Sequence, residues 1–167
     1  AGFVYSQTLL ACVELDLFSH LDRPRSVEDL AGRLDLAPDR CRRLLQAAAS
    51  LDLVSRQGPE YGLGPLGAAL TGAPGVTEMV RHHALFYRDL SDPVALLRDG
   101  TEPELARFWA YVGGASTHDM PTDVAASYST LMAVSQTMVA EETLAAAPLT
   151  GVRHLLDIGG GEGAFLE

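Results

Sequence analysis

The sequence predicts a mainly α-helical chain that closes on the first strand and glycine turn of an α/β domain. Three observations lead to this fold class. Apolar residues recur at helical spacing through most of the 167 residues. A hairpin pattern interrupts them between Leu53 and Leu63, and the last residues run from an apolar strand into a glycine-rich turn. The 47% hydrophobic and 20% charged content are those of a globular protein with a buried core.

The first predicted helix runs from Phe3 to Leu21, and a polar stretch with Pro24 ends it. It is amphipathic because leucine and valine side chains recur on one face. The side chains on this face are Leu10, Val13, Leu17 and Leu21.

Two short helices and a hairpin are predicted next. Ser26 is a suitable N-cap with Asp29 three residues later, and the apolar spacing that follows predicts a helix of about two turns that ends by Leu34. Pro38 suits the first turn of a second helix, which we expect to extend to Leu51. With the hairpin that follows, this is the element order of a winged helix.

A winged helix often binds DNA, and the second helix carries Arg40, Arg42, Arg43 and Gln46. The charge argues against this function, because residues 20–70 hold seven acidic and seven basic side chains and the chain has a net charge of −10. DNA-binding modules need a basic face. We therefore expect no nucleic-acid partner, and a winged-helix transcription regulator stays as the competing interpretation.

Residues 75–149 are predicted to be helical, with turn signals at 92–93, 99–100 and 113–114. The last helix is expected from Val124 to Ala147, where Pro148 ends it. Aromatic and methionine side chains at helical spacing in this region belong to a core or to an adaptable apolar pocket.

Several features indicate no metal site, no membrane segment and a cytoplasmic location. His82 and His83 are adjacent, so they point about 100° apart on a helix and cannot share one ion. Cys12 and Cys41 fall on apolar helical positions and are expected to be small buried hydrophobes in a reducing compartment. No run approaches the roughly 20 apolar residues that a membrane span requires.

The motif at residues 154–166 reads His-Leu-Leu-Asp-Ile-Gly-Gly-Gly-Glu-Gly-Ala-Phe-Leu. Apolar residues lead to Asp157 and then to Gly159, Gly161 and Gly163, where a cofactor must approach the backbone closely. This spacing fits S-adenosylmethionine enzymes better than NAD enzymes. An incidental loop is the alternative, because a ribose-binding acid roughly 20 positions on would lie beyond Glu167.

Taken together, the winged-helix pattern, the long helix and the Leu-Leu-Asp-Ile-Gly-Gly-Gly-Glu-Gly sequence resemble the class I S-adenosylmethionine-dependent O-methyltransferases with an N-terminal dimerisation domain. Within that class, residues 81–97 and 129–136 and the glycine ending resemble the carotenoid hydroxyneurosporene/demethylspheroidene O-methyltransferases. The resemblance implies a winged-helix dimerisation domain over residues 1–115 and a connecting helical segment over 116–150. Residues 151–167 would be the truncated start of a Rossmann-like methyltransferase domain.

The resemblance also implies a function. The protein would be a homodimer that transfers a methyl group from S-adenosylmethionine to a hydroxyl of an apolar small molecule. A carotenoid is the expected acceptor, and polyketide or phenolic acceptors are the alternative. Asp157 and the three glycines would bind the cofactor, whereas the general base would lie beyond Glu167, so the chain alone would be inactive. Expected acceptor contacts are Phe86, Trp109, Met132 and Met138.

Overall fold

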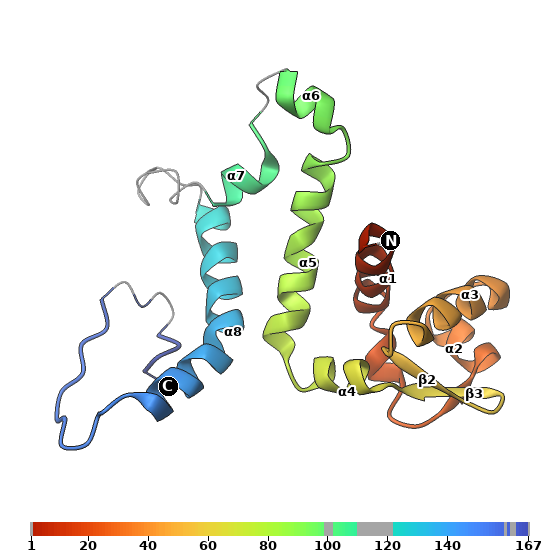
Figure 1. The fold of residues 1–167 in the computed structure, drawn as a ribbon, viewed down its shortest axis with the longest axis horizontal. Coiled ribbons are helices and arrows are strands. Elements are labelled where there is room, and N and C mark those ends of the chain that lie inside the picture. The colour runs from red at the N-terminus through yellow and green to blue at the C-terminus, as the bar shows by residue number, and fades with distance from the viewer. Residues whose placement is uncertain (1, 99–101, 110–121, 159, 161–162, 167) are drawn as a thin grey trace. The chain divides into compact units, whose positions relative to one another are not determined.

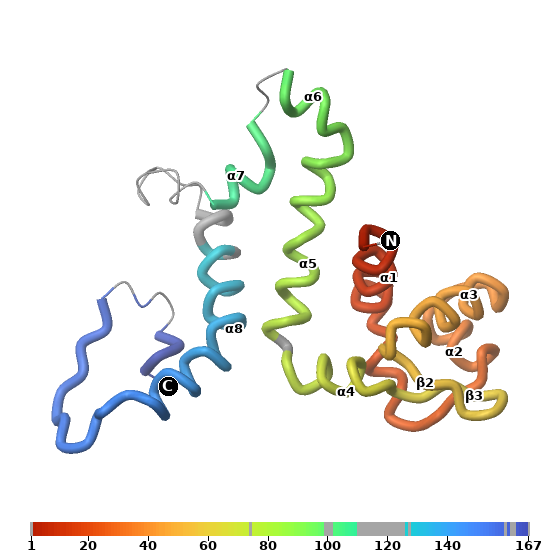
Figure 2. Tube along the Cα trace, in the orientation of Figure 1, coloured from red at the N-terminus to blue at the C-terminus, as the bar shows by residue number. Residues whose placement is uncertain are grey.

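The computed structural model describes residues 2–98, 102–109, 122–158, 160 and 163–166, and these residues are mainly helical (Figure 1). Figure 2 traces the same chain through its Cα atoms. The chain divides into two compact units, residues 1–81 and 82–167. The helices are α1 (Gly2–Glu14), the 3-10 helix η1 (Leu17–His20), α2 (Val27–Arg33), α3 (Pro38–Ala49), α4 (Pro65–Thr71), α5 (Pro74–Asp89), α6 (Pro93–Arg98), α7 (Glu104–Phe108) and α8 (Thr122–Ala146). The strands β1 (Arg25–Ser26), β2 (Val54–Gln57) and β3 (Glu60–Leu63) form an antiparallel sheet in the order β1-β3-β2.

The core of the first unit lies among α1, η1, α2, α3 and the sheet. The apolar spacing predicted after Ser26 is confirmed, because Leu30 of α2 is fully buried, and Leu45 of α3 is fully buried as well. Both cysteines are also buried and free, and burial raises the pKa of the Cys12 thiol to about 12. The remaining core side chains are Val13, Leu17, Phe18, Leu21, Val27, Ala31, Leu34, Ala48, Leu53, Val54 and Tyr61.

The first helix is shorter than predicted. It ends at Glu14, Asp16 adopts a left-handed conformation with φ 51°, and the chain continues as η1. Aspartate tolerates this region better than most residues, and the Ser19 hydroxyl donates to the Asp16 carboxylate at 2.6 Å. The prediction of a single helix from Phe3 to Leu21 was therefore wrong. The reason is packing, because the turn carries Leu17 into the core, where it is fully buried.

The helix pair and the hairpin form as predicted. Ser26 caps α2, since its hydroxyl accepts a hydrogen bond from the Asp29 amide at 3.2 Å, and Pro38 opens α3. The hairpin between β2 and β3 turns at Gly58, whose φ is 62°. The sequence did not predict β1, in which Arg25 pairs with Tyr61 at the edge of the sheet.

Arg25 is the one polar side chain recorded in the core of the described residues, with 8% of its surface exposed. Its Nε donates to the His20 carbonyl at 2.6 Å, and its two terminal nitrogens donate to Asp29 at 2.9 Å and Asp22 at 2.7 Å. These contacts hold the pKa of both carboxyls below their usual value. The ion pairs therefore stabilise the fold above the ordinary aspartate pKa and are lost as the pH falls through the lowered values.

In the second unit, α5 ends at Asp89 and the predicted turn at Asp92-Pro93 is confirmed. The Asp92 carboxylate accepts a hydrogen bond from the Ala95 amide at 2.9 Å at the start of α6. The turns predicted at 99–100 and 113–114 lie outside the described residues. The last helix was predicted over 124–147, and α8 spans Thr122–Ala146.

The strand predicted before the glycine turn is not formed. Residues 152–157 have no regular secondary structure, and Leu156 and Ile158 are 81% and 86% exposed. A buried parallel strand requires neighbouring strands for its hydrogen bonds and its side chains, and the described part of residues 82–167 contains none. Residues 163–166 form a turn.

We predict that Gly67→Ala destabilises the first unit by about 1–3 kcal/mol, the usual effect of overpacking. A Cβ at Gly67 would run into the backbone carbonyl of Leu53, which cannot move without disturbing the sheet. The matched control is Gly32→Ala in α2, where nothing lies within 4 Å of the added Cβ. Chemical denaturation should show the control about 0.5–1 kcal/mol more stable than the parent. Equal stabilities of the two variants would contradict this close packing.

Candidate functional site

The end of α5 is joined to the start of α7 by a carboxylate cap. Asp89 Oδ1 accepts a hydrogen bond from the Glu104 amide at 2.8 Å, and its Oδ2 accepts one from the Leu105 amide at 2.9 Å. The neighbouring Arg88 donates from Nε and Nη2 to Glu104 Oε2 at 3.0 and 2.8 Å. The cap satisfies two amides that a helix leaves without intrahelical partners at its first turn. Both interactions together fix where α7 begins.

Four rings from α5, α7 and α8 form an aromatic cluster, which consists of His82, Phe108, Trp109 and Tyr128. The His82 ring lies 4.5 Å from Phe108 and 5.7 Å from Trp109, measured between ring centroids. Tyr128 lies 5.2 Å from Trp109 in an edge-to-face arrangement, which aromatic pairs favour. The cluster therefore packs α7 between the other two helices.

The cluster also contains a polar contact. Trp109 Nε1 donates a hydrogen bond to His82 Nε2 at 2.9 Å. An imidazole nitrogen can accept only when it carries no proton, so His82 is neutral with its proton on Nδ1. Desolvation, followed by repulsion from His83, lowers the pKa of His82 from 6.5, which agrees with the neutral form.

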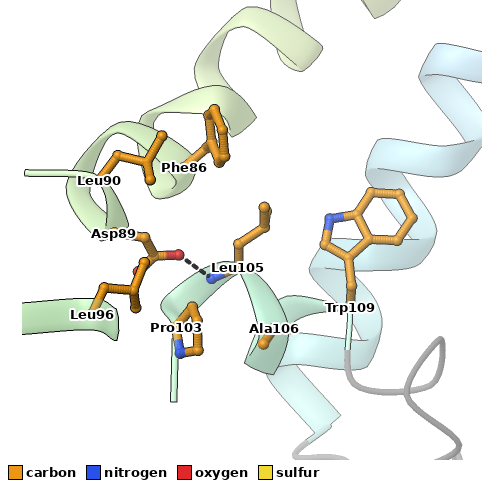
Figure 3. Close-up of a pocket in the computed structure, with 8 residues that line it drawn as sticks. All are labelled: Phe86, Asp89, Leu90, Leu96, Pro103, Leu105, Ala106 and Trp109. Atoms are coloured by element: carbon orange, nitrogen blue, oxygen red, sulfur yellow. Dashed lines mark hydrogen bonds between the residues drawn. The ribbon is translucent and has the colours of Figure 1, made fainter. Parts of the chain in front are cut away.

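Beside this cluster lies a cavity of about 580 Å³ (Figure 3). Its size is in the range of small-molecule sites, which are mostly apolar with a few polar groups. In Figure 3 the Leu105 side chain points into the space between Phe86 and Trp109. Asp89 is the charged side chain among the described lining residues, and both of its oxygens are bound to α7 amides. The lining residues are Phe86, Asp89, Leu90, Leu96, Pro103, Leu105, Ala106 and Trp109.

Two of the four predicted acceptor contacts lie together, because Phe86 and Trp109 both line this cavity. Met132 is half-buried on α8 and Met138 is 54% exposed, and neither is among the lining residues. Their role stays a prediction. The sequence analysis missed the leucine side chains of the cavity. A signal was present in the i, i+4 spacing of Phe86 with Leu90 and in that of Leu105 with Trp109.

The glycine motif retains some of the features predicted for a cofactor loop. Gly163 has φ 87°, which favours glycine, and a Cβ at Gly160 would collide with the carboxylate of Asp157. Gly159 and Gly161 lie outside the described residues. Asp157 Oδ2 is buried and has no hydrogen-bond partner among the described residues. The buried Oδ2 of Asp157 can accept a hydrogen bond, and the neighbouring glycines leave the backbone open to a ligand. These features fit a ligand that donates a hydrogen bond, as the amino group of S-adenosylmethionine would.

Among the described residues, no group of three His, Cys, Asp or Glu side chains is arranged to hold a metal ion. In the same residues, every helix is too short or too polar to cross a lipid bilayer.

Comparison with known proteins identifies the class. Residues 1–72 match the O-methyltransferase dimerisation domain, and residues 87–167 match the O-methyltransferase domain. The chain therefore belongs to the family of O-methyltransferases that carry an N-terminal dimerisation domain.

Among curated proteins, the chain is similar to demethylspheroidene O-methyltransferases. It is 51% identical to the protein of Cereibacter sphaeroides over 169 residues, which cover 99% of this chain and 44% of that protein. It is 47% identical to the protein of Rhodobacter capsulatus over 170 residues, covering 100% and 42%. The chain thus spans less than half the length of these relatives.

Solved structures share the fold. Human N-acetylserotonin methyltransferase in complex with SAM superposes with a TM-score of 0.70 at 22% identity, over 98% of this chain and 51% of that chain. Mitomycin 7-O-methyltransferase MmcR also gives a TM-score of 0.70 at 22% identity, over 98% and 50%. The mainly helical architecture is therefore that of known methyltransferases.

We predict that Trp109 fluorescence reports the protonation of His82. Trp109 is the single tryptophan, so its emission comes from this site alone. The pKa of His82 is lowered in the folded chain, so the unfolded chain binds more protons below about pH 6.5. The stabilising contact is therefore complete above that pH. It is lost as the pH falls through the lowered pKa, and the emission should change there.

His82→Gln should abolish this transition, because the glutamine carbonyl can still accept from the indole but does not titrate. His83→Gln is the matched control and should keep it. A fluorescence titration of the three proteins provides the measurement. An emission that does not change with pH in the parent, or a transition that persists in His82→Gln, would show that the contact is misassigned.

Proposed function

We propose that this chain is the N-terminal part of an enzyme that transfers a methyl group from S-adenosylmethionine to a hydroxyl of an apolar small molecule, a carotenoid of the hydroxyneurosporene type. The observation that carries this proposal is the 51% identity to a demethylspheroidene O-methyltransferase over 99% of the chain. The reaction is an in-line displacement, in which the hydroxyl oxygen attacks the sulfonium methyl group and loses its proton. Such a step depends on orientation and on a base.

Within this function, Asp157 and the loop glycines Gly159, Gly161 and Gly163 bind the cofactor. The free buried acceptor of Asp157 and the left-handed backbone of Gly163 support this assignment. The bound cofactor supplies the methyl group. We assign no general base within residues 1–167, and we propose that these residues alone do not catalyse transfer.

We propose that the first unit is a winged helix used for dimerisation. The succession of α2, α3 and the β2–β3 hairpin, with β1 as a third strand, supports the winged helix. The match of residues 1–72 to a dimerisation domain supports the use of this unit for dimerisation. In the functional division that we propose, residues 1–115 form this domain, 116–150 connect it, and 151–167 begin the cofactor domain.

The arginine contacts favour dimerisation over a transcription regulator. Arg42 of α3 pairs with Asp39 at 3.1 Å and approaches Glu28 at 3.5 Å, and Arg33 pairs with Asp29 at 3.0 Å. Guanidinium groups that are already paired release fewer counterions from DNA. On the helix that would enter a groove, one arginine is thus already paired, and the equal numbers of acidic and basic side chains over residues 20–70 also support a protein-binding role for this unit.

We predict that the longer protein, incubated with methyl-labelled S-adenosylmethionine, produces a labelled methyl ether of a hydroxylated carotenoid. Residues 1–167 alone serve as the inactive comparison. A polyketide and phenolic panel tests the alternative acceptors. Methylation of phenols alone would show that phenols, and not carotenoids, are the acceptors. The absence of transfer to any hydroxyl would overturn the proposed function.

In the same protein, Gly163→Ala should weaken S-adenosylmethionine binding at least tenfold, because an added Cβ strains the backbone and obstructs the cofactor. Gly151→Ala is the matched control, since Gly151 has a similar φ of 84° and equally open surroundings outside the motif. Calorimetry should show the affinity of the control within about twofold of the parent, a difference below 0.5 kcal/mol.

We also predict a homodimer of twice 17.8 kDa. On α1, the side chains of Phe3, Val4 and Tyr5 are 66%, 62% and 52% exposed, and large apolar side chains exposed together at one end of a helix are typical of an interface. Light scattering after gel filtration should give the dimer mass for the parent. Val4→Glu should shift it toward the monomer, whereas Gln46→Glu, the same added charge at an exposed site of α3, should not. A monomeric parent at tens of micromolar, roughly the range for stable dimers, would contradict the prediction.

A further inference from the structure

We propose that the cavity between α5, α6 and α7 binds the hydrocarbon part of the acceptor as an extended unsaturated chain, and that the reacting hydroxyl stays outside it. The ligand class is thus an apolar polyene without a polar group at its buried end. This inference rests on the proposed function for the identity of the acceptor, but the binding site can be tested without methyl transfer.

Among the described residues that line the cavity, the polar side-chain groups already have hydrogen-bond partners. Both oxygens of Asp89 accept hydrogen bonds from α7 amides at 2.8 and 2.9 Å. The indole N–H of Trp109 donates to His82 Nε2 at 2.9 Å. A ligand that brought hydroxyl or carbonyl groups into this space would lose its hydrogen bonds to water and gain none from these side chains. The site therefore discriminates against polar ligands.

The other described side chains of the wall are hydrocarbon or aromatic. Leu105 projects between Phe86 and Trp109 (Figure 3), so an occupant would lie against both rings and a leucine. Flat, polarisable conjugated chains pack well on aromatic rings. A volume of about 580 Å³ is large enough for one stretch of hydrocarbon. The chemistry of the described wall therefore points to this ligand class.

The planar polyphenols and polyketides that are the alternative acceptors have hydroxyl and carbonyl groups distributed around their rings. Burial of such rings in the cavity would take some of these groups out of water without offering them hydrogen bonds from the described lining side chains. The apolar end of a long chain with a single hydroxyl does not have this conflict. The cavity therefore favours the carotenoid class on physical grounds that are independent of sequence identity.

The test uses residues 1–167 and diphenylhexatriene, a conjugated hydrocarbon that absorbs where tryptophan emits and becomes fluorescent in apolar surroundings. Trp109 is the single tryptophan and lines the cavity, so energy transfer from it reports binding at this place. We expect saturable quenching of Trp109 with a matching rise in probe emission. The flavonol quercetin, a planar polyphenol, should bind at least tenfold more weakly.

Ala106→Phe fills the cavity without removing a contact and should weaken probe binding at least tenfold. Ala145→Phe makes the same change at an exposed position of α8 and should leave binding within twofold. Circular dichroism of both variants checks that each keeps the helical content of the parent, and Leu105→Phe is a second filling variant if Ala106→Phe does not fold. No saturable transfer in the parent, equal binding by Ala106→Phe, or tighter binding of quercetin would each overturn the proposal.

The two proposals fail separately. If diphenylhexatriene binds as expected and the longer protein transfers no methyl group, the binding site stands and the proposed function is wrong. If the longer protein methylates hydroxycarotenoid and Ala106→Phe leaves its KM for that acceptor unchanged, the function stands and the cavity is not where the hydrocarbon binds.

Discussion

The second unit depends on the hydrogen bonds between the Asp89 carboxylate and the first amides of α7. Helix α7 has five residues, and a helix of that length is not stable in water without tertiary contacts. Hydrogen bonds to a charged group contribute about 1.5–3 kcal/mol each, whereas an exposed ion pair such as Arg88–Glu104 contributes about 0–1 kcal/mol. The cap is therefore the stronger restraint. It sets the direction in which α7 leaves the loop.

The position of Trp109 follows from this cap, because Trp109 lies one residue beyond the end of α7. The helix starts at the C-terminal end of α5 and runs back toward His82, which receives the indole hydrogen bond. His82, Phe86 and Asp89 are spaced i, i+4 and i+7 and so share one face of α5. One residue of that face binds the indole, one lines the cavity and one caps α7. A substitution of Asp89 would therefore be expected to displace both the start of α7 and Trp109.

The sequence predicted elements whose causes are local. The N-cap Ser26, the proline at the start of α3 and the hairpin glycine act within a few residues, and each formed where expected. The break at Asp16 was missed because its cause is the burial of Leu17 in a core made by distant segments. Phe86 and Trp109 were predicted as acceptor contacts, but their meeting depends on Asp89 and the amides about fifteen residues later. The periodicity of apolar residues does not predict a hydrogen bond between a carboxylate and a distant helix end.

The failed strand and the free carboxylate of Asp157 have a common physical origin. Leu156 and Ile158 stay exposed because no described strand of the second unit pairs with their backbone, and Asp157 Oδ2 stays without a donor in the same segment. An unsatisfied buried acceptor costs about 1–3 kcal/mol, so this segment gains stability from any strand or ligand that completes it. The cavity, in contrast to this segment, is formed by residues close in the sequence. Its described lining residues and the contacts of Asp89 and Trp109 all lie within residues 82–109. Under the proposed function, the acceptor side of the enzyme is thus formed by local contacts, whereas the cofactor side requires the neighbouring strands of a sheet.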